Sequence, residues 1–135
     1  MSDPVVLLNV DKRGVATITL NRPEVNNAYN GEFVKVMIEA VVQCSNDINV
    51  RIIIIRGNGK HFQAGADLKW LKEIGKLSPQ ENLEVSRLTA SAIRGLTETM
   101  KPTVALIHGG CFGGGTGIAA SCDIVIASDD ALFSI

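Results

Sequence analysis

Short apolar stretches recur along the chain and are separated by polar or glycine-rich segments. The runs VVLLNV and VATITL flank DKRG and predict a β-hairpin with Gly14 in its turn. Four consecutive isoleucines, residues 52–55, stand between Arg51 and Arg56 and predict a strand covered on both faces, as in a parallel sheet. The later runs TVALIH, DIVIA and ALFSI predict further strands.

Apolar residues at helical spacing predict helices between these strands. One such pattern covers residues 30–47, and a short helix is expected over 68–74. A longer helix should begin at Pro79, because proline suits the first helical turn, and should end before Pro102. Its apolar positions are Val85, Leu88, Ala92, Leu96 and Met100. Repeated strand–helix–strand units predict an α/β fold with a mostly parallel sheet.

The segment HGGCFGGGTGIAASCD, residues 108–123, is rich in glycine, which costs backbone entropy and buries no side chain. It follows a predicted strand and opens into a predicted short helix that runs through Ala120. At such a place the first helical N–H groups are unpaired, and an oxygen atom can approach a backbone without side chains. The segment therefore suits an oxyanion hole, although close packing between helix and strand would also demand small residues.

Two phosphate-binding alternatives fit this segment less well. A Walker loop needs Lys-Ser or Lys-Thr after its last glycine, but Gly117 and Ile118 follow Thr116. A dinucleotide fingerprint requires G-x-G-x-x-G with an acidic residue further on, and here the glycines give G-x-G-x-G. A nicotinamide-binding domain remains a third hypothesis.

Another loop of small residues, FQAGADL, covers residues 62–68 and also follows a buried strand. Ala64 and Ala66 flank Gly65, so side-chain bulk is again missing from the backbone. Because the two loops follow neighbouring strands of one predicted sheet, each could direct one N–H group at the same oxygen atom.

Four segments in order resemble the enoyl-CoA hydratase/isomerase (crotonase) family: LNRPEVNNAYN, HFQAGADLKWL, KPTVALIHGGCFGGGTG and ASCDIVIASDDALFSI. The resemblance extends over all 135 residues. It implies a crotonase-like spiral of ββα units with a mostly parallel sheet. Residues 1–135 would be the N-terminal portion of a single domain, truncated before the C-terminal helical part. It also implies assembly of the complete protein into homo-trimers or hexamers.

The same resemblance implies a site for an acyl-CoA thioester. The backbone N–H groups of Ala66 and Gly114 correspond to the family's oxyanion donors. The residues expected to contact the substrate are Ala64, Ala66, Asp67, Leu68, Lys69 and Gly114. The loop over residues 22–27 would help to grip the nucleotide end. Coenzyme A is then part of the substrate, and no further cofactor is expected.

Two positions depart from the pattern of the family's hydratases, which use a pair of glutamates. The first position corresponds to Gly117, and the second would lie just beyond Ile135. Hydration of a 2-enoyl-CoA is the leading prediction. The alternatives are double-bond isomerisation and an inactive homologue that binds CoA esters. The stretch CFGGGTGIAASCD also resembles bacterial methylglutaconyl-CoA hydratases.

Several residues near the two loops have simple structural explanations. Asp67 suits the start of a helix, where a carboxylate accepts from first-turn N–H groups. His108 is expected to brace a loop, and Cys111 is disfavoured as a nucleophile. Trp70 and Leu71 are expected to pack against the acyl or pantetheine channel, or in the core.

Composition excludes several function classes. Lys and Arg number 13 against 14 Asp and Glu, so there is no basic surface for nucleic acid. No apolar run is long enough for a membrane span, and the N-terminus has no signal-peptide pattern, which predicts a cytoplasmic protein. Cys44, Cys111 and Cys122 lack the spacing of a zinc or disulfide site and are expected to be buried thiols.

Overall fold

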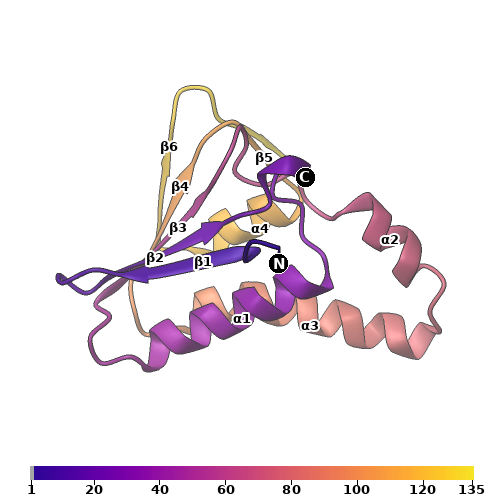
Figure 1. The fold of residues 1–135 in the computed structure, drawn as a ribbon, viewed down its shortest axis with the longest axis horizontal. Coiled ribbons are helices and arrows are strands. Elements are labelled where there is room, and N and C mark those ends of the chain that lie inside the picture. Colours follow the sequence, from indigo (N-terminus) through magenta and orange to yellow (C-terminus); the bar gives the residue numbers. More distant parts are fainter. Residues whose placement is uncertain (1) are drawn as a thin grey trace.

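A five-stranded sheet forms the centre of the computed structural model, which describes residues 2–135 (Figure 1). Its order is β1-β2-β3-β4-β6, with β1 antiparallel to β2 and the other neighbours parallel. These strands are β1 (Val6–Val10), β2 (Val15–Leu20), β3 (Ile52–Gly57), β4 (Thr103–Ile107) and β6 (Ile124–Ala127). A second, two-stranded parallel sheet joins β5 (Gly110–Phe112) to β7 (Leu132–Ser134). The predicted α/β fold with a mostly parallel sheet is confirmed.

Capping side chains satisfy first N–H groups at the starts of α1, α2 and α3, whereas η1 and α4 have no side-chain cap. They are the 3-10 helix η1 (Pro23–Val25) and the α-helices α1 (Gly31–Asn46), α2 (Leu68–Ile74), α3 (Pro79–Glu98) and α4 (Gly114–Ser121). Asn30 accepts a hydrogen bond from the N–H of Phe33 at the start of α1. Ser78 and Glu81 form a reciprocal capping box at the start of α3. The four α-helices lie close to the predicted ranges, except that α3 ends at Glu98, before Met100, and η1 was not predicted.

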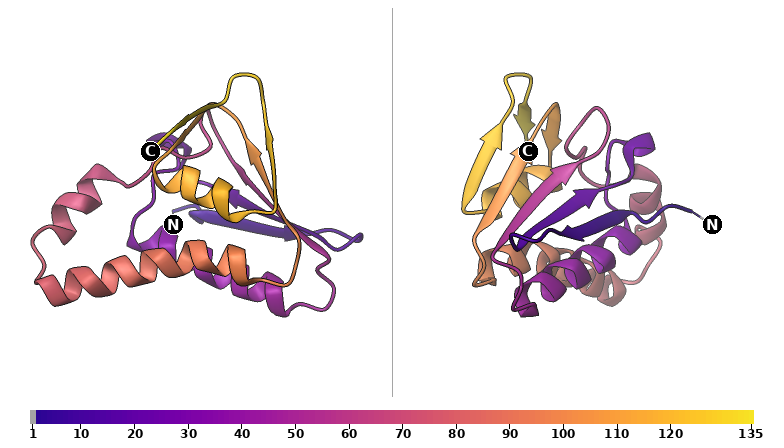
Figure 2. Two further views of the ribbon diagram at one scale, coloured as in Figure 1. Left: turned by 180° about the vertical axis from the view of Figure 1, so that it is seen from behind. Right: turned by 60° about the vertical axis from the view of Figure 1, so that its left-hand side comes forward.

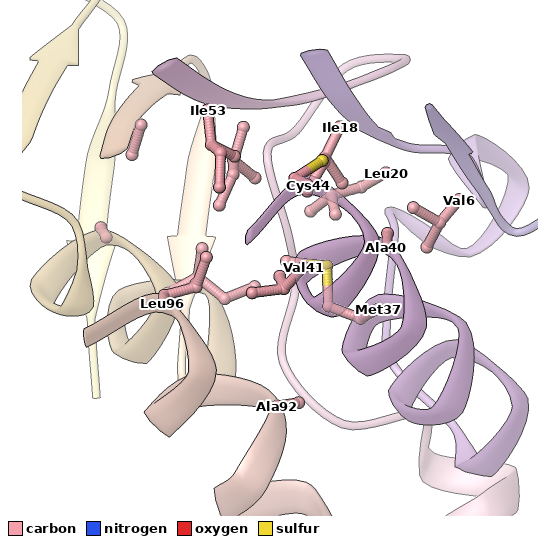
Figure 3. Packing of buried hydrophobic residues seen from close by; sticks show 14 of the residues in the cluster. Val6, Ile18, Leu20, Met37, Ala40, Val41, Cys44, Ile53, Ala92 and Leu96 are labelled. Atoms are coloured by element: carbon pink, nitrogen blue, oxygen red, sulfur yellow. The ribbon is translucent and has the colours of Figure 1, made fainter. Parts of the chain in front are cut away.

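The hydrophobic core lies between the sheet and helices α1 and α3 (Figure 3). From the sheet, Ile18 and Ile53 are fully buried. From α1, Met37 and Cys44 pack beneath them, and Leu96 closes the core from α3. This packing fixes the carboxyl ends of β3 and β4, from which the two small-residue loops continue.

The prediction that β3 is covered on both faces is wrong. Ile53 and Ile55 are fully buried, but Ile52 and Ile54 on the opposite face are only half-buried. The reason is that α1 and α3 both lie on one side of the sheet (Figure 2). The isoleucine run therefore reflects β-propensity and the burial of one face.

The apolar pattern of α3 is buried only near the end of the helix. Ala92 and Leu96 are in the core, whereas Leu88 is 39% exposed and Met100, after the helix, is 95% exposed. The first part of α3 extends past the sheet toward α2 (Figure 1). Within residues 2–135, no helix combines the length and apolar character that a membrane crossing needs.

Candidate active site

The loop over residues 62–68, called the first loop from here on, is held between the glycine-rich loop that follows β4, called the second loop, and the segment before α1. Gln63 pairs with Cys111 in a parallel bridge: its N–H donates to the carbonyl of Gly110 at 3.2 Å. On the other side, Ala64 N–H donates to the carbonyl of Asn26 at 3.0 Å. Gly65 has φ +85°, a left-handed conformation that lets the chain turn between these two contacts.

Asn27 braces the first loop from behind. Its side chain is fully buried, and its Nδ2 donates to the carbonyls of Asn58 at 2.8 Å and of Phe62 at 3.1 Å. Arg22 donates from its guanidinium to Asp67 at 3.0 Å and also to the carbonyl of Ala28. The side chains of Arg22 and Asn27 are thus engaged within the protein. The predicted grip of residues 22–27 on a nucleotide would fall to the exposed part of that loop.

The second loop is anchored by polar side chains as β4 ends. Gly110 N–H donates to Nδ1 of His61 at 2.8 Å, and Gly109 N–H donates to Asp130 at 3.2 Å. A Cβ on Gly109 would lie 2.3 Å from the carbonyl oxygen of Lys60, and its φ is +58°. Glycine is therefore required there by close approach of another backbone.

The two loops touch where the family resemblance places the oxyanion donors. A Cβ built on Gly113 would lie 3.6 Å from the Cα of Gly65. A Cβ built on Gly65 would lie 3.4 Å from the carbonyl oxygen of Phe112. The residues that follow these contacts are Ala66 and Gly114, the two predicted donors.

The N–H groups of Ala66 and Gly114 make no hydrogen bond among residues 2–135. The backbone N–H of Tyr29 donates to the carbonyl of Gly65, and the backbone carbonyl of Tyr29 accepts from the N–H of Asp67, both at 2.9 Å. The N–H of Ala66, between these bonds, therefore faces away from Tyr29. Gly114 is the first residue of α4, so its N–H has no partner within the helix.

Close packing between helix and loop also explains part of the glycine run, which was the alternative to an oxyanion hole. A Cβ on Gly114 would lie 2.6 Å from Cε1 of Tyr29, and one on Gly115 would lie 3.0 Å from the carbonyl oxygen of Gln63. At Gly117 a Cβ would meet Ile93 Cδ1 at 3.7 Å, an ordinary contact. A larger side chain at 117 would fit without collision at its first atom.

Asp67 has the structural role that the sequence indicated. Its carboxylate accepts from Lys69 N–H at 2.9 Å and Trp70 N–H at 3.4 Å, and so caps α2. Burial raises the pKa of Asp67, but hydrogen bonds from Arg22, Trp70 and Lys69 outweigh it, and the pKa is lowered overall. The carboxylate is therefore charged at neutral pH and committed to these partners.

The histidine and cysteines near the two loops also have structural rather than catalytic environments. His108 contacts the carbonyl of Gly59 through Nε2 at 2.8 Å and braces a loop. Cys111 is fully buried, and burial raises the pKa of its thiol, which disfavours a nucleophilic role. Burial likewise raises the pKa of Cys122 to about 11. In the described part of the chain, no group of metal-binding side chains occurs.

An open groove lies beside α2. Its volume is about 370 Å³, and it is lined by Arg22, Asn30, Gly31, Glu32, Asp67, Lys69, Trp70 and Glu73. Trp70 meets Tyr29 edge-on with ring centroids 5.7 Å apart. Leu71 is 40% exposed and Leu68 is 75% exposed, so neither belongs to the core. Lys69 is the exposed cation of this groove.

A smaller, mostly apolar cavity of about 40 Å³ has Gly114 in its wall. It is enclosed by α1, α3 and α4 and includes Tyr29 and Gln63 in its wall. Sequence reasoning did not single out either residue. The sequence carries no distinct signal for Gln63, because a single glutamine is an ordinary loop residue and only the fold shows that it is buried.

The chain is similar to known proteins over most of its length. The family model for enoyl-CoA hydratase/isomerase matches residues 11–135. A short-chain-enoyl-CoA hydratase from Clostridium acetobutylicum is 39% identical over 126 residues, covering 92% of this chain and 47% of the relative. A mitochondrial Delta(3,5)-Delta(2,4)-dienoyl-CoA isomerase from Dictyostelium discoideum is 34% identical over 139 residues, covering 93% of this chain and 45% of the relative.

Solved structures match the fold closely. A Legionella pneumophila protein assigned to the enoyl-CoA hydratase/isomerase (crotonase) class has TM-score 0.93 and 39% identity, covering 98% of this chain and 51% of its own. An enoyl-CoA hydratase from Shewanella pealeana has TM-score 0.92 and 31% identity, and the match covers 96% of this chain and 48% of that protein. The chain spans about half the length of these relatives. None of these four is named as a methylglutaconyl-CoA hydratase, so that narrower likeness stays a prediction.

The match over residues 11–135 and the shared fold establish that the chain belongs to the enoyl-CoA hydratase/isomerase family.

Proposed function

We propose that the protein binds an acyl-CoA thioester and stabilises its enolate, with hydration of a 2-enoyl-CoA as the reaction. The observation that carries this proposal is the pair of unpaired N–H groups, Ala66 and Gly114, on two loops in contact. Polar N–H groups without a partner at a surface of small residues are suited to bind one carbonyl oxygen.

These N–H groups would act on the charge that develops during the reaction. The oxygen of water bonds to C3 of the enoyl group while one of the water protons passes to a base. The C2–C3 π electrons then form the C1–C2 double bond, the carbonyl π electrons move onto the thioester oxygen, and an enolate results. The enolate then takes a proton at C2. Each donor that meets this oxygen lowers the barrier, and loss of one such donor costs about 3–4 kcal/mol in other enzymes.

Proton transfer would need groups other than the two amides. Gly117 stands at the first carboxylate position of the resemblance and carries no acid–base group. The second position would lie beyond Ile135, in a longer protein of which residues 1–135 would form the N-terminal portion of one domain. The half-length match to the relatives supports this arrangement. Assembly into trimers or hexamers stays a prediction.

The groove beside α2 is our candidate for the coenzyme A portion. It adjoins the first loop through Asp67, and Lys69 offers an exposed positive charge for a phosphate. The carboxylate of Asp67 already accepts hydrogen bonds from Arg22 and from the first turn of α2. Its role is therefore to fix the shape of the groove. Ala64 and Leu68 would contribute backbone and apolar surface.

Isomerisation of an enoyl-CoA double bond is the second candidate function. Gly117 favours it, because moving a proton between two carbons needs no carboxylate to hold a water molecule. The Dictyostelium relative is named as a dienoyl-CoA isomerase. A third candidate is an inactive homologue that only binds CoA esters.

One set of assays separates these functions. The 135-residue chain and a chain extended at its C-terminus are tested for hydration of but-2-enoyl-CoA and isomerisation of a 3-enoyl-CoA. We expect hydration in the extended chain only. Isomerisation without hydration would select the second candidate, and binding without turnover in both chains would select the third. Equal hydration by both chains would overturn the assignment of proton transfer to residues beyond Ile135. Thermal unfolding with added ligand tests the nicotinamide-binding hypothesis. Stabilisation of the fold by a dinucleotide and not by CoA would overturn the proposed acyl-CoA chemistry.

A further inference from the structure

Gln63 is a fully buried polar side chain without a hydrogen-bond partner. Its exposed fraction is 0%, and neither Nε2 nor Oε1 is paired with any atom of residues 2–135. Its backbone, by contrast, is fully used in the bridge to the second loop. Buried amide groups in folded proteins are nearly always hydrogen-bonded, so this one calls for a partner that the chain itself does not supply.

The unpaired amide lies at the small cavity beside Gly114. Gln63 and Gly114 both line this cavity, whose volume is about 40 Å³. Oε1 of Gln63 lies 3.2 Å from the point where a Cβ on Gly114 would stand. If Gly114 holds the thioester oxygen, the amide of Gln63 lies within a few atoms of the reacting end of the acyl group.

The rest of the cavity wall restricts the chemistry of the partner. Six of its residues are apolar: Phe33, Val34, Met37, Ala92, Ile93 and Ile118. The hydroxyl of Thr89 already donates to the carbonyl of Val85 at 2.9 Å. In the described residues, no charged side chain lines the cavity.

A carboxylate here would be buried without an opposite charge, which is strongly unfavourable. A purely alkyl group would leave both amide atoms unpaired. The amide offers two N–H donors and an acceptor oxygen, so an uncharged group that both donates and accepts matches it best.

We propose that Gln63 is a specificity-determining residue, selecting acyl groups that carry a hydroxyl close to the thioester over alkyl and carboxylate-bearing acyl groups. This inference rests on the proposed acyl-CoA function and names its substrate class. The hydroxyl accepts from Nε2 or donates to Oε1 and fills the space next to Gly114. An ordered water in the cavity is the competing partner, and it would give no such preference.

The test compares matched substrates on the full-length protein. These are but-2-enoyl-CoA, its 4-hydroxy derivative, and pent-2-enedioyl-CoA, which carries a carboxylate. We expect the highest kcat/KM for the hydroxy substrate. In Gln63→Met, which keeps length and loses the amide, kcat/KM for that substrate should fall about tenfold or more, with little change for but-2-enoyl-CoA. Gln43→Met makes the same change at an exposed position outside this cavity and is the matched control, which should alter kcat/KM for neither substrate.

Equal losses on all three substrates in Gln63→Met, or no preference for the hydroxy substrate in the unaltered protein, would overturn the inference. Turnover of but-2-enoyl-CoA would still stand in that case, so the proposed function would survive. If the protein bound no acyl-CoA, both the proposed function and this inference would be wrong.

A second measurement needs no variant and is independent of folding. The side-chain NH₂ resonances of Gln63 are followed by NMR as saturated 4-hydroxybutanoyl-CoA and butanoyl-CoA are added to the unaltered protein. We expect a shift with the hydroxy ligand that butanoyl-CoA does not reproduce. The same response to both ligands would contradict a direct contact.

Discussion

At the residue scale, Asp67 shows how one side chain sets the geometry of the candidate site. It caps α2, and it pairs with Arg22, whose side chain is only 13% exposed. We expect Asp67→Ala to lower the free energy of unfolding by about 2 kcal/mol at neutral pH, because the cap and the partner of Arg22 are both lost. Chemical denaturation measures this change. Glu73→Ala, exposed on the same helix, is the control and should have little effect.

The pKa of Asp67 gives this contribution a definite pH dependence. Burial raises the pKa, but the hydrogen bonds from Arg22, Trp70 and Lys69 lower it below the ordinary value of 3.8. A lowered carboxyl pKa stabilises the folded state above the unfolded pKa, and the stabilisation is lost as the pH falls through the folded pKa. The difference between the unaltered protein and Asp67→Ala should therefore shrink below about pH 4. A difference that stays constant through the acid range would contradict this account.

Sequence reasoning reached the backbone donors and missed the side chain beside them. Ala66 and Gly114 could be proposed because small residues and helix starts have a clear physical meaning. Gln63 could not, since a lone glutamine is ordinary in a loop. Only the fold shows that it is buried, unpaired and next to Gly114.

At the scale of elements, α4 combines glycines that the structure requires with one that it does not. A Cβ at Gly115 would lie only 3.0 Å from the carbonyl oxygen of Gln63, a backbone atom with little room to move, whereas one at Gly117 would make an ordinary contact with Ile93. We expect Gly117→Ala to raise the free energy of unfolding by about 0.5–1 kcal/mol, because glycine weakens helices relative to alanine. Gly115→Ala should lower it. Thermal unfolding of the two variants would disprove this if both moved in the same direction.

Helices and strands were predictable to different degrees. The range 68–74 for α2 agrees with the structure because Asp67 and the apolar spacing mark it clearly. β5 was not predicted, because Gly110 and Cys111 carry no strand signal and their pairing with Leu132 and Phe133 is distant in sequence. The one-sided burial of β3 was missed because an isoleucine run does not say which layers cover it.

At the scale of the whole molecule, the sheet brings together two loops that are far apart in the sequence. β3 and β4 are parallel neighbours, so the chain leaves both at the same edge, and the contact between Gly65 and Gly113 follows. The family could be recognised from motif order alone. The sequence predicted that the two loops follow neighbouring strands, and the fold shows that they are in contact. The function of their N–H groups stays a proposal.

The central claim is that Ala66 and Gly114 direct their N–H groups at one thioester oxygen. The most direct measurement is a ¹H–¹⁵N NMR titration of the full-length protein with acetoacetyl-CoA, whose enolate form mimics the reacting oxygen, and with free CoA as control. The account predicts downfield shifts of both N–H resonances with acetoacetyl-CoA only, while Ala64, whose N–H is already bonded to Asn26, changes little. If the resonances of Ala66 and Gly114 stay in place, or move equally with free CoA, the two groups do not form an oxyanion hole.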